Sequence, residues 1–255
     1  MLYFSGTGNS KYVAEMFCHY MNKETDTDTA ESISIEDNTN FSRLINSEEV
    51  IAFCYPVYSS RVPRIMRDFA LKYKDFLEGK KIIILCTQML FSGDGARAFT
   101  DLFPGDYFEV IYAEHFLMPN NICNVFLVPL ASKNTVKRYL RYAERKMKTV
   151  CENINAGIIK KRGFNIFSRL LGLPQGYFWP AIEEKIKRSV RINDDCTQCG
   201  RCFSSCPMNN LTFEKGEITH KSNCLGCYRC VNDCQQKAIT AFFHARVKRQ
   251  YEGLD

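Results

Sequence analysis

Eight of the 13 cysteines in this chain lie between residues 196 and 234, and they repeat one spacing twice. The run Cys-x2-Cys-x2-Cys-x3-Cys occurs at residues 196–206 and again at 224–234. Where thiols stay reduced, cysteines at short, regular spacing bind metal more often than they form disulfides. Structural zinc takes pairs of Cys-x2-Cys, whereas runs of four thiolates suit iron–sulfur cubanes. The doubled run therefore predicts two [4Fe–4S] clusters.

Residues 190–245 resemble the two-cluster bacterial ferredoxins, in which this run is typical. The resemblance implies crossed ligation, because the fourth cysteine of each run then binds the cluster of the other run. One cluster would be held by Cys196, Cys199, Cys202 and Cys234, and the other by Cys224, Cys227, Cys230 and Cys206. Short apolar segments at 211–213, 218–219 and 239–241 are predicted strands beside the clusters.

The remaining cysteines and the histidines give no comparable pattern. Free cysteine is among the most buried residue types and packs as a small hydrophobe. We therefore expect core packing and no chemistry for Cys18, Cys54, Cys86, Cys123 and Cys151. The four histidines (His19, His115, His220 and His244) are scattered, and we find neither a Ser-His-Asp order nor an H-E-x-x-H motif. The sequence predicts no catalytic residue.

The first half of the chain alternates apolar runs with helical periodicity. We expect strands at 2–4, 32–35, 50–55, 81–86 and 107–116, and helices at 11–21, 62–77, 95–103 and 136–154. Uninterrupted apolar runs suit strands that are buried on both faces of a parallel sheet. The alternation predicts an α/β fold with a doubly wound, five-stranded parallel sheet. In such sheets, ligands bind beyond the carboxyl ends of the strands.

A loop of small residues separates the first predicted strand from the first predicted helix. Glycines let a backbone approach a ligand closely, and N–H groups at a helix N-terminus bind phosphate. Hydroxyl groups add further donors without adding charge. We expect a terminal phosphate to bind at Ser5, Gly6, Thr7, Gly8, Asn9 and Ser10.

This loop resembles the FMN phosphate loop of flavodoxins, and two later segments lie where that family closes around the flavin. The segment 56–60 follows the third predicted strand, and the segment 87–95 follows the fourth. The resemblance implies a flavodoxin-like fold and FMN, with Tyr58 and the 87–95 loop beside the isoalloxazine ring. The candidate cofactor-binding residues here are Pro56, Val57, Tyr58, Ser59, Thr87, Gln88, Gly93, Asp94 and Gly95.

Together the two halves resemble a fusion family of anaerobes that joins a flavodoxin-like region to a two-cluster ferredoxin. Met118-Pro119-Asn120-Asn121 is similar to the segment after strand five in that family. We expect an FMN-binding domain at 1–156, a connector at 157–189 and a small α+β ferredoxin-like domain at 190–255. The resemblance implies electron transfer between two clusters and FMN. The alternatives are a flavin-dependent reductase fed by the clusters, which would be an oxidoreductase, and an iron–sulfur redox sensor or interaction module.

Charge and hydrophobicity single out the connector. The chain has a net charge of +6, but residues 1–132 carry −6, residues 133–191 carry +11 and residues 192–255 carry +1. This local excess argues against nucleic-acid binding. The connector is also rich in large apolar side chains, so we expect it to pack between the domains, fixing them in one electron path.

Two alternative roles for the basic stretch are docking of an acidic redox protein, which we favour, and peripheral contact with a membrane surface. No apolar run is long enough to span a bilayer, and no secretory signal precedes the first strand. We therefore expect a cytoplasmic protein with redox protein partners.

Overall fold

The computed structural model describes residues 1–91, 93–125, 127–214 and 216–254, and its centre is a parallel sheet. Within these residues the sheet has six strands in the order β2-β1-β3-β4-β5-β6. The doubly wound fold is thus confirmed, with one strand more than expected. The strands are β1 (Leu2–Tyr3), β2 (Ile33–Ser34), β3 (Val50–Pro56), β4 (Lys81–Gln88), β5 (Glu109–Leu117) and β6 (Lys160–Lys161).

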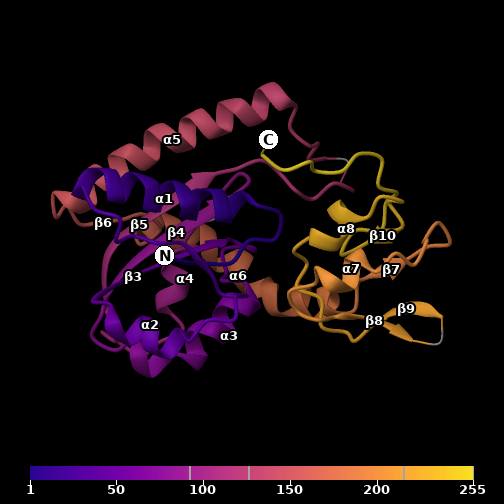
Figure 1. Cartoon of the computed structure of the whole chain (residues 1–255), viewed down its shortest axis with the longest axis horizontal. Coiled ribbons are helices and arrows are strands. Elements are labelled where there is room, and N and C mark those ends of the chain that lie inside the picture. Colours follow the sequence, from indigo (N-terminus) through magenta and orange to yellow (C-terminus); the bar gives the residue numbers. More distant parts are fainter. Residues whose placement is uncertain (92, 126, 215, 255) are drawn as a thin grey trace.

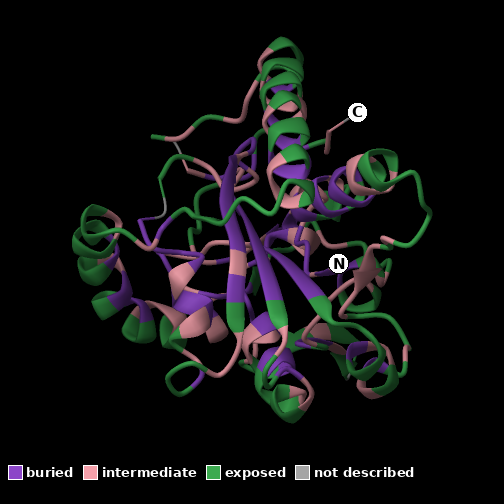
Figure 2. Ribbon diagram, turned by 90° about the vertical axis from the view of Figure 1, so that its left-hand side faces the viewer, coloured by how far each residue is buried: buried purple, intermediate pink, exposed green. Residues whose placement is uncertain are grey.

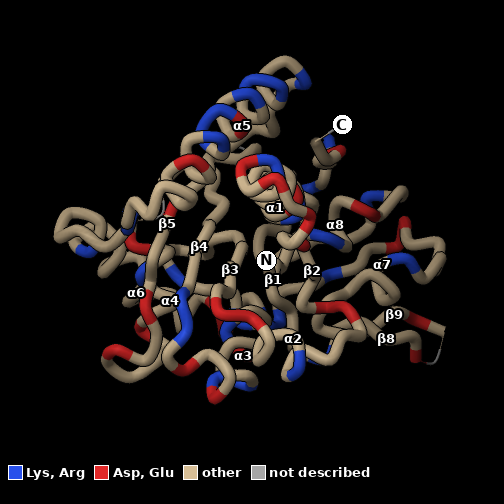
Figure 3. The backbone as a smooth tube through the Cα atoms, turned by 60° about the vertical axis from the view of Figure 1, so that its left-hand side comes forward, with Lys and Arg blue, Asp and Glu red and all other residues tan. Residues whose placement is uncertain are grey.

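Helices cover both faces of the sheet. One face packs against α1 (Asn9–Thr25) and α5 (Lys133–Asn155). The other packs against α2 (Phe41–Ser47), α3 (Arg64–Lys72), the 3₁₀ turn η1 (Lys74–Phe76) and α4 (Arg97–Thr100). Figure 2 shows the central strands buried along most of their length. Figure 3 shows that Lys and Arg follow α5, as the charge distribution predicts.

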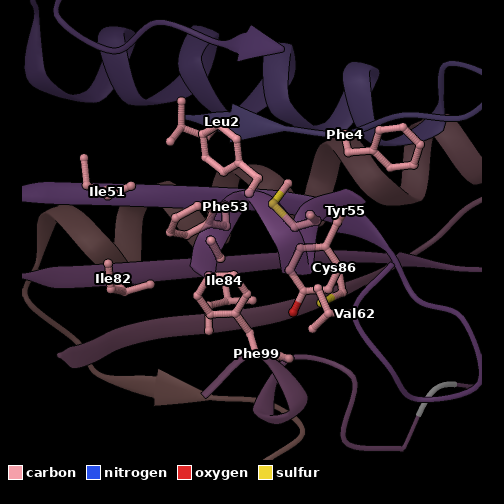
Figure 4. Packing of buried hydrophobic residues seen from close by; sticks show 14 of the residues in the cluster. Leu2, Phe4, Ile51, Phe53, Tyr55, Val62, Ile82, Ile84, Cys86 and Phe99 are labelled. Carbon is pink, nitrogen blue, oxygen red and sulfur yellow. The ribbon is translucent and has the colours of Figure 1, made fainter. Parts of the chain in front are cut away.

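Alternation along the strands divides the core into two layers. Phe53 and Ile84 face α2 and α3, whereas Cys54 and Leu85 face α1 and α5. Figure 4 shows the first layer, in which the rings of Phe53 and Phe99 lie 4.6 Å apart between centroids. Of the cysteines outside the runs, Cys18, Cys54, Cys86 and Cys151 are buried and Cys123 is half-buried. Burial raises the pKa of the Cys86 thiol to about 12.

The sixth strand is held by a buried carboxylate. Glu114 on β5 accepts ion pairs from Lys146, Lys160 and Arg162 at 2.9, 3.0 and 3.4 Å. Burial opposes its charge, but the His115 backbone N–H and Lys146 hold the pKa of Glu114 below its usual value. A pair of lysines carries no strand signal in the sequence. The ion pairs with Glu114 therefore explain why the strand forms and why its sequence does not predict it.

His115, the next residue, is buried and neutral. Its Nε2 accepts a hydrogen bond from the backbone N–H of Ala96 at 3.2 Å. Burial, followed by the charge of Arg162, lowers the pKa of His115 to about 4. The side chain therefore has a structural role, connecting β5 to the start of α4.

The C-terminal part is small and lies beside the carboxyl edge of the sheet (Figure 1). Strand β7 (Arg191–Ile192) pairs with β10 (Ile239–Thr240), and β8 (Leu211–Glu214) forms a hairpin with β9 (Glu217–His220). Two short helices, α7 (Arg201–Ser204) and α8 (Arg229–Asp233), each follow a cysteine and a left-handed residue. The predicted α+β character of this part is confirmed.

The connector forms a long helix, α6 (Ile166–Lys187), and its packing differs from the prediction. The inner face is formed by Gly172, Gly176, Trp179 and Ile186, all buried. Most of the large apolar side chains instead point to the surface: Ile166, Phe167, Leu170, Leu171, Leu173, Tyr177 and Phe178 are exposed. The expectation that these side chains pack between the domains is wrong, because glycines occupy the contact face.

Candidate functional site

The loop between β1 and α1 has the backbone shape of a phosphate site. Gly8 precedes α1 with a φ of 101°, a left-handed conformation that favours glycine. The Ser5 hydroxyl accepts a hydrogen bond from the Gly8 N–H at 3.1 Å, and the Ser10 and Thr87 hydroxyls lie 2.7 Å apart. The positive end of the α1 dipole is directed at the same place. The loop can therefore hold an anion without a lysine.

A cavity of about 350 Å³ opens beside this loop, at the carboxyl edge of the sheet. Pockets of this volume hold small molecules and cofactors. Most of the residues that the sequence predicts meet here: Ser5, Gly6, Thr7, Asn9, Ser10, Pro56, Val57, Tyr58, Ser59, Thr87 and Gln88. The predicted carboxyl-edge location therefore agrees with the cavity.

The remaining predicted residues lie elsewhere. Gly8 shapes the loop but does not line the cavity. The segment 93–95 packs under α6, where a Cβ on Gly172 would lie 1.8 Å from Oδ1 of Asp94. Asp94 forms an ion pair with Arg97 at 3.1 Å. Ser92, in the predicted 87–95 loop, lies outside the described residues.

Several cavity residues come from segments outside the predicted cofactor-binding residues. The segment 118–122 contributes one wall, although the sequence likeness of residues 118–121 carried no site assignment. Helix α6 contributes Gln175, Trp179 and Ile186, and the C-terminal part contributes Leu225, Gly226, Tyr228 and Phe242. No local motif marks these residues, because only the packing of the two parts brings them to the cavity.

Two aromatic side chains give the cavity an apolar wall. The rings of Tyr58 and Trp179 lie 6.0 Å apart between centroids, at an angle of 50°. Loss of hydration raises the pKa of Tyr58 well above its usual value. The phenol therefore stays neutral, and this wall favours a planar aromatic ligand over a charged one.

The eight cysteines line two further cavities, four in each. We call Cys206, Cys224, Cys227 and Cys230 the inner set, because their cavity lies next to the phosphate loop. We call Cys196, Cys199, Cys202 and Cys234 the outer set. Each set combines three cysteines of one run with the fourth cysteine of the other. Cys224 and Cys227 of the inner set are buried, whereas Cys199 of the outer set is exposed.

Backbone N–H groups donate hydrogen bonds to equivalent sulfurs in the two cysteine runs. N–H groups point at the first sulfur of each run, from Gln198 to Cys196 at 3.4 Å and from Gly226 to Cys224 at 3.3 Å. The fourth sulfurs, of Cys206 and Cys234, accept hydrogen bonds from backbone N–H groups at 3.3 and 3.4 Å. Such bonds stabilise thiolates and tune cluster potentials.

The donor chemistry of both sets suits a cluster. Each set places four cysteine thiols around one small cavity. Four thiolates are the ligands of a [4Fe–4S] cubane, so the residues present fit this group. Across the described ranges, no three His, Cys, Asp or Glu side chains form a site for a single metal ion.

The inner set is in contact with the phosphate loop. A Cβ built on Gly6 would lie 2.6 Å from the carbonyl oxygen of Cys227, so only glycine permits this approach. Arg229 donates to the carbonyl oxygens of Ser5 and Gly6 at 2.7 and 3.1 Å. Asn121 bridges the junction, donating to Thr7 Oγ1 at 2.9 Å and to the Cys227 carbonyl at 3.3 Å.

Two more contacts fix the C-terminal part. Arg64 on α3 donates to the side chain and the backbone carbonyl of Asn223 at 2.7 and 2.9 Å. Near the end of the chain, the Tyr251 hydroxyl donates to Oδ1 of Asn9 at 2.6 Å. The phosphate loop is therefore bordered by residues from both ends of the sequence.

A family comparison agrees with this geometry. The model of the flavodoxin domain matches residues 1–170. The chain belongs to the flavodoxin family. A second family model, the 4Fe-4S dicluster domain, matches residues 188–238. The flavodoxin and ferredoxin resemblances are thus confirmed. FMN and [4Fe–4S] clusters are the cofactors of these domains, and the role they support is electron transfer.

Two solved flavodoxins are similar to part of the chain. A flavodoxin from the domain Archaea is 14% identical, with a TM-score of 0.42, over 60% of this chain and 95% of that one. Two-electron reduced flavodoxin of Megasphaera elsdenii is 21% identical, with a TM-score of 0.36, over 45% of this chain and 82% of that one. No curated protein matches the chain.

Proposed function

We propose that this flavodoxin–ferredoxin protein passes single electrons between its surface and a bound FMN through two [4Fe–4S] clusters. When bound, each cluster exchanges one electron and FMN exchanges one or two. The protein supplies binding, orientation and electrostatics. Residues 1–156 would form the flavin domain and residues 190–255 the cluster domain, with 157–189 between them.

The residues that would hold FMN surround the cavity of about 350 Å³. The FMN phosphate would bind to backbone N–H groups and hydroxyls of residues 5–10, at the N-terminus of α1. Tyr58 and Trp179 would border the ring system, and segments 87–91 and 118–122 would close around it. The uncharged loop favours a terminal phosphate. FMN ends in such a phosphate, whereas a dinucleotide carries an internal pyrophosphate.

The residues that would hold the clusters are the inner and outer cysteine sets. The environments of the two sets differ, because Cys224 and Cys227 are buried and Cys199 is exposed. The outer set, which includes the exposed Cys199, would contact a redox protein, and the inner set, which lies next to the phosphate loop, would contact the flavin site. Along the electron path, the inner set would lie between the outer set and the flavin cavity.

One observation carries the proposal: the carbonyl of Cys227 packs directly on Gly6. A cysteine of the inner set and the phosphate loop are thereby held in van der Waals contact. Electron tunnelling falls steeply with distance, so a fixed contact supports transfer within one molecule. Arg229 and Arg64 keep this contact from opening.

Stopped-flow mixing tests the relay. Protein with reduced clusters is mixed anaerobically with limiting oxidant, and the flavin and cluster absorbances are followed at several dilutions. We expect a first-order exchange rate that does not change with protein concentration. The control mixes Thr7→Glu, designed to lack FMN, with Cys206→Ala, designed to lack the inner cluster. Exchange in wild-type protein that slows in proportion to dilution, as in this mixture, would refute the proposal.

A further inference from the structure

The outer surface of α6 is apolar, although it faces solvent. Phe167, Tyr177 and Phe178 are 74%, 79% and 60% exposed, and four Leu and Ile side chains of the same helix are also exposed. Contiguous apolar surface of this kind marks an interaction site in most proteins. The surface is unrelated to the flavin and cluster sites, which lie on the other side of the helix.

Contacts on the opposite face hold the helix in this orientation. That face is fitted by glycines, since a Cβ on Gly176 would lie 2.0 Å from the Arg61 guanidinium. Trp179 packs against Tyr58 on the same face, and Glu183 forms an ion pair with Arg67 at 2.9 Å. These contacts direct the apolar side chains of α6 outward.

We call the exposed apolar side chains of this helix the α6 face: Ile166, Phe167, Leu170, Leu171, Leu173, Tyr177 and Phe178. The 89–91 loop also has exposed apolar side chains, Leu90 and Phe91, but these line the flavin cavity and do not belong to the α6 face.

The charged residues just before α6 and along its first four turns are basic. Residues 153–182 contain no Asp or Glu, but they contain Lys160, Lys161, Arg162 and Arg169. Lys160 and Arg162 are paired with Glu114, which leaves Lys161 and Arg169 for an anionic ligand. At the far end, the acidic Glu183 and Glu184 are paired with Arg67 and Lys187. A helix that lies in a membrane interface combines basic residues with an apolar surface, as this segment does with its Phe, Tyr and Leu side chains.

We infer that the α6 face binds the surface of a membrane rich in anionic lipids. No helix in the described parts of the chain is long and apolar enough to cross a bilayer. The helix would therefore lie parallel to the membrane, with its aromatic and leucine side chains among the acyl chains and Lys161 and Arg169 near the phosphates.

This orientation has a geometric consequence. The inner face of α6 lines the flavin cavity through Gln175 and Trp179. A helix with its side chains is about 10–12 Å across. The membrane would thus lie about one helix diameter from the cavity, on the opposite side of α6.

Vesicle flotation tests the inference. The holoprotein is floated with vesicles of phosphatidylcholine alone or with 30% phosphatidylglycerol, and we expect binding to the anionic vesicles. The double variant Phe167→Ser/Tyr177→Ser should bind at least about tenfold more weakly, because two large apolar side chains are lost. The matched control, Phe213→Ser/Tyr142→Ser, removes a Phe and a Tyr elsewhere that are 51% and 54% exposed, and it should bind as wild type does.

The charge contribution is measured separately. Lys161→Gln and Arg169→Gln should each weaken binding to anionic vesicles about fivefold, and the effect should shrink in high salt. Absence of vesicle binding would overturn the inference, as would equal losses in the α6 and control variants. A dimer that dissociates in Phe167→Ser/Tyr177→Ser, without vesicle binding, would assign the face to a second copy. Equal cofactor content in all variants shows that each has folded.

Discussion

Arg229 connects the C-terminal part to the phosphate loop through several hydrogen bonds. Besides its bonds to Ser5 and Gly6, its guanidinium donates to both carboxylate oxygens of Glu36, at 2.8 and 2.7 Å. The substitution Arg229→Met keeps an apolar stem of similar length and removes every donor. The loop carbonyls and the Glu36 carboxylate then lose their partner.

The size of the effect follows from these contacts. A hydrogen bond from a charged group contributes about 1.5–3 kcal/mol. The Glu36 side chain is 24% exposed and can rehydrate, which reduces the loss from that ion pair. We expect the variant to lose about 3 kcal/mol of unfolding free energy in total. For a chain of this size, that corresponds to a melting temperature lower by about 6–12 °C.

The cysteine repeat supplies a matched control. Arg201 occupies the same position in the first run as Arg229 does in the second, but it is exposed. Thermal unfolding of the anaerobic holoproteins, followed by far-ultraviolet circular dichroism, compares Arg229→Met with Arg201→Met. We expect the Arg201 variant to melt within about 2 °C of wild type. Equal shifts in the two variants, or a shift below 2 °C for Arg229→Met, would refute the assigned role of Arg229.

Three further predictions concern single residues. Thr7→Glu places a carboxylate in the phosphate loop and should abolish FMN binding, measured by flavin fluorescence on titration; unchanged affinity would contradict the assignment. Cys206→Ala should remove the cluster of the inner set and leave the outer one, so iron per chain should fall by half; selective loss of the outer cluster would disprove crossed ligation. His115 should destabilise the fold as pH falls below about 6.5, because its folded pKa is about 4 and the unfolded chain binds the proton first, with a loss of about 2 kcal/mol between pH 7 and 5. His115→Asn should remove this pH dependence of the melting temperature.

The sequence predicts the parts of the site that local geometry determines. Cysteine spacing defines the two runs, and the loops after strands β1, β3 and β4 converge because parallel neighbouring strands end at one edge. The sequence does not predict the walls added by Trp179 and Leu225, since these depend on how two separately patterned segments pack. Strand β6 is missed because ion pairs to Glu114, and not β propensity, hold it.

The sequence does not predict the orientation of α6, for a different reason. Large apolar residues occur all round this helix, so hydrophobic periodicity cannot select its buried face. The signal that does select the face is the pair Gly172 and Gly176, one helical turn apart, where the side chains of Asp94 and Arg61 pack against the helix. Small residues at that spacing allow another element to approach a helix closely.

The contact between Tyr251 and Asn9 has a consequence for biosynthesis. A ribosome makes residues 5–10 more than 200 residues before Leu225, Tyr228 and Phe242, which border the same cavity. A nascent chain can therefore form the sheet, but it cannot complete the cavity until the cysteine runs have been made. Iron–sulfur insertion and flavin binding then occur in the same period. Conditions that starve the cell of iron should therefore also yield protein depleted of FMN.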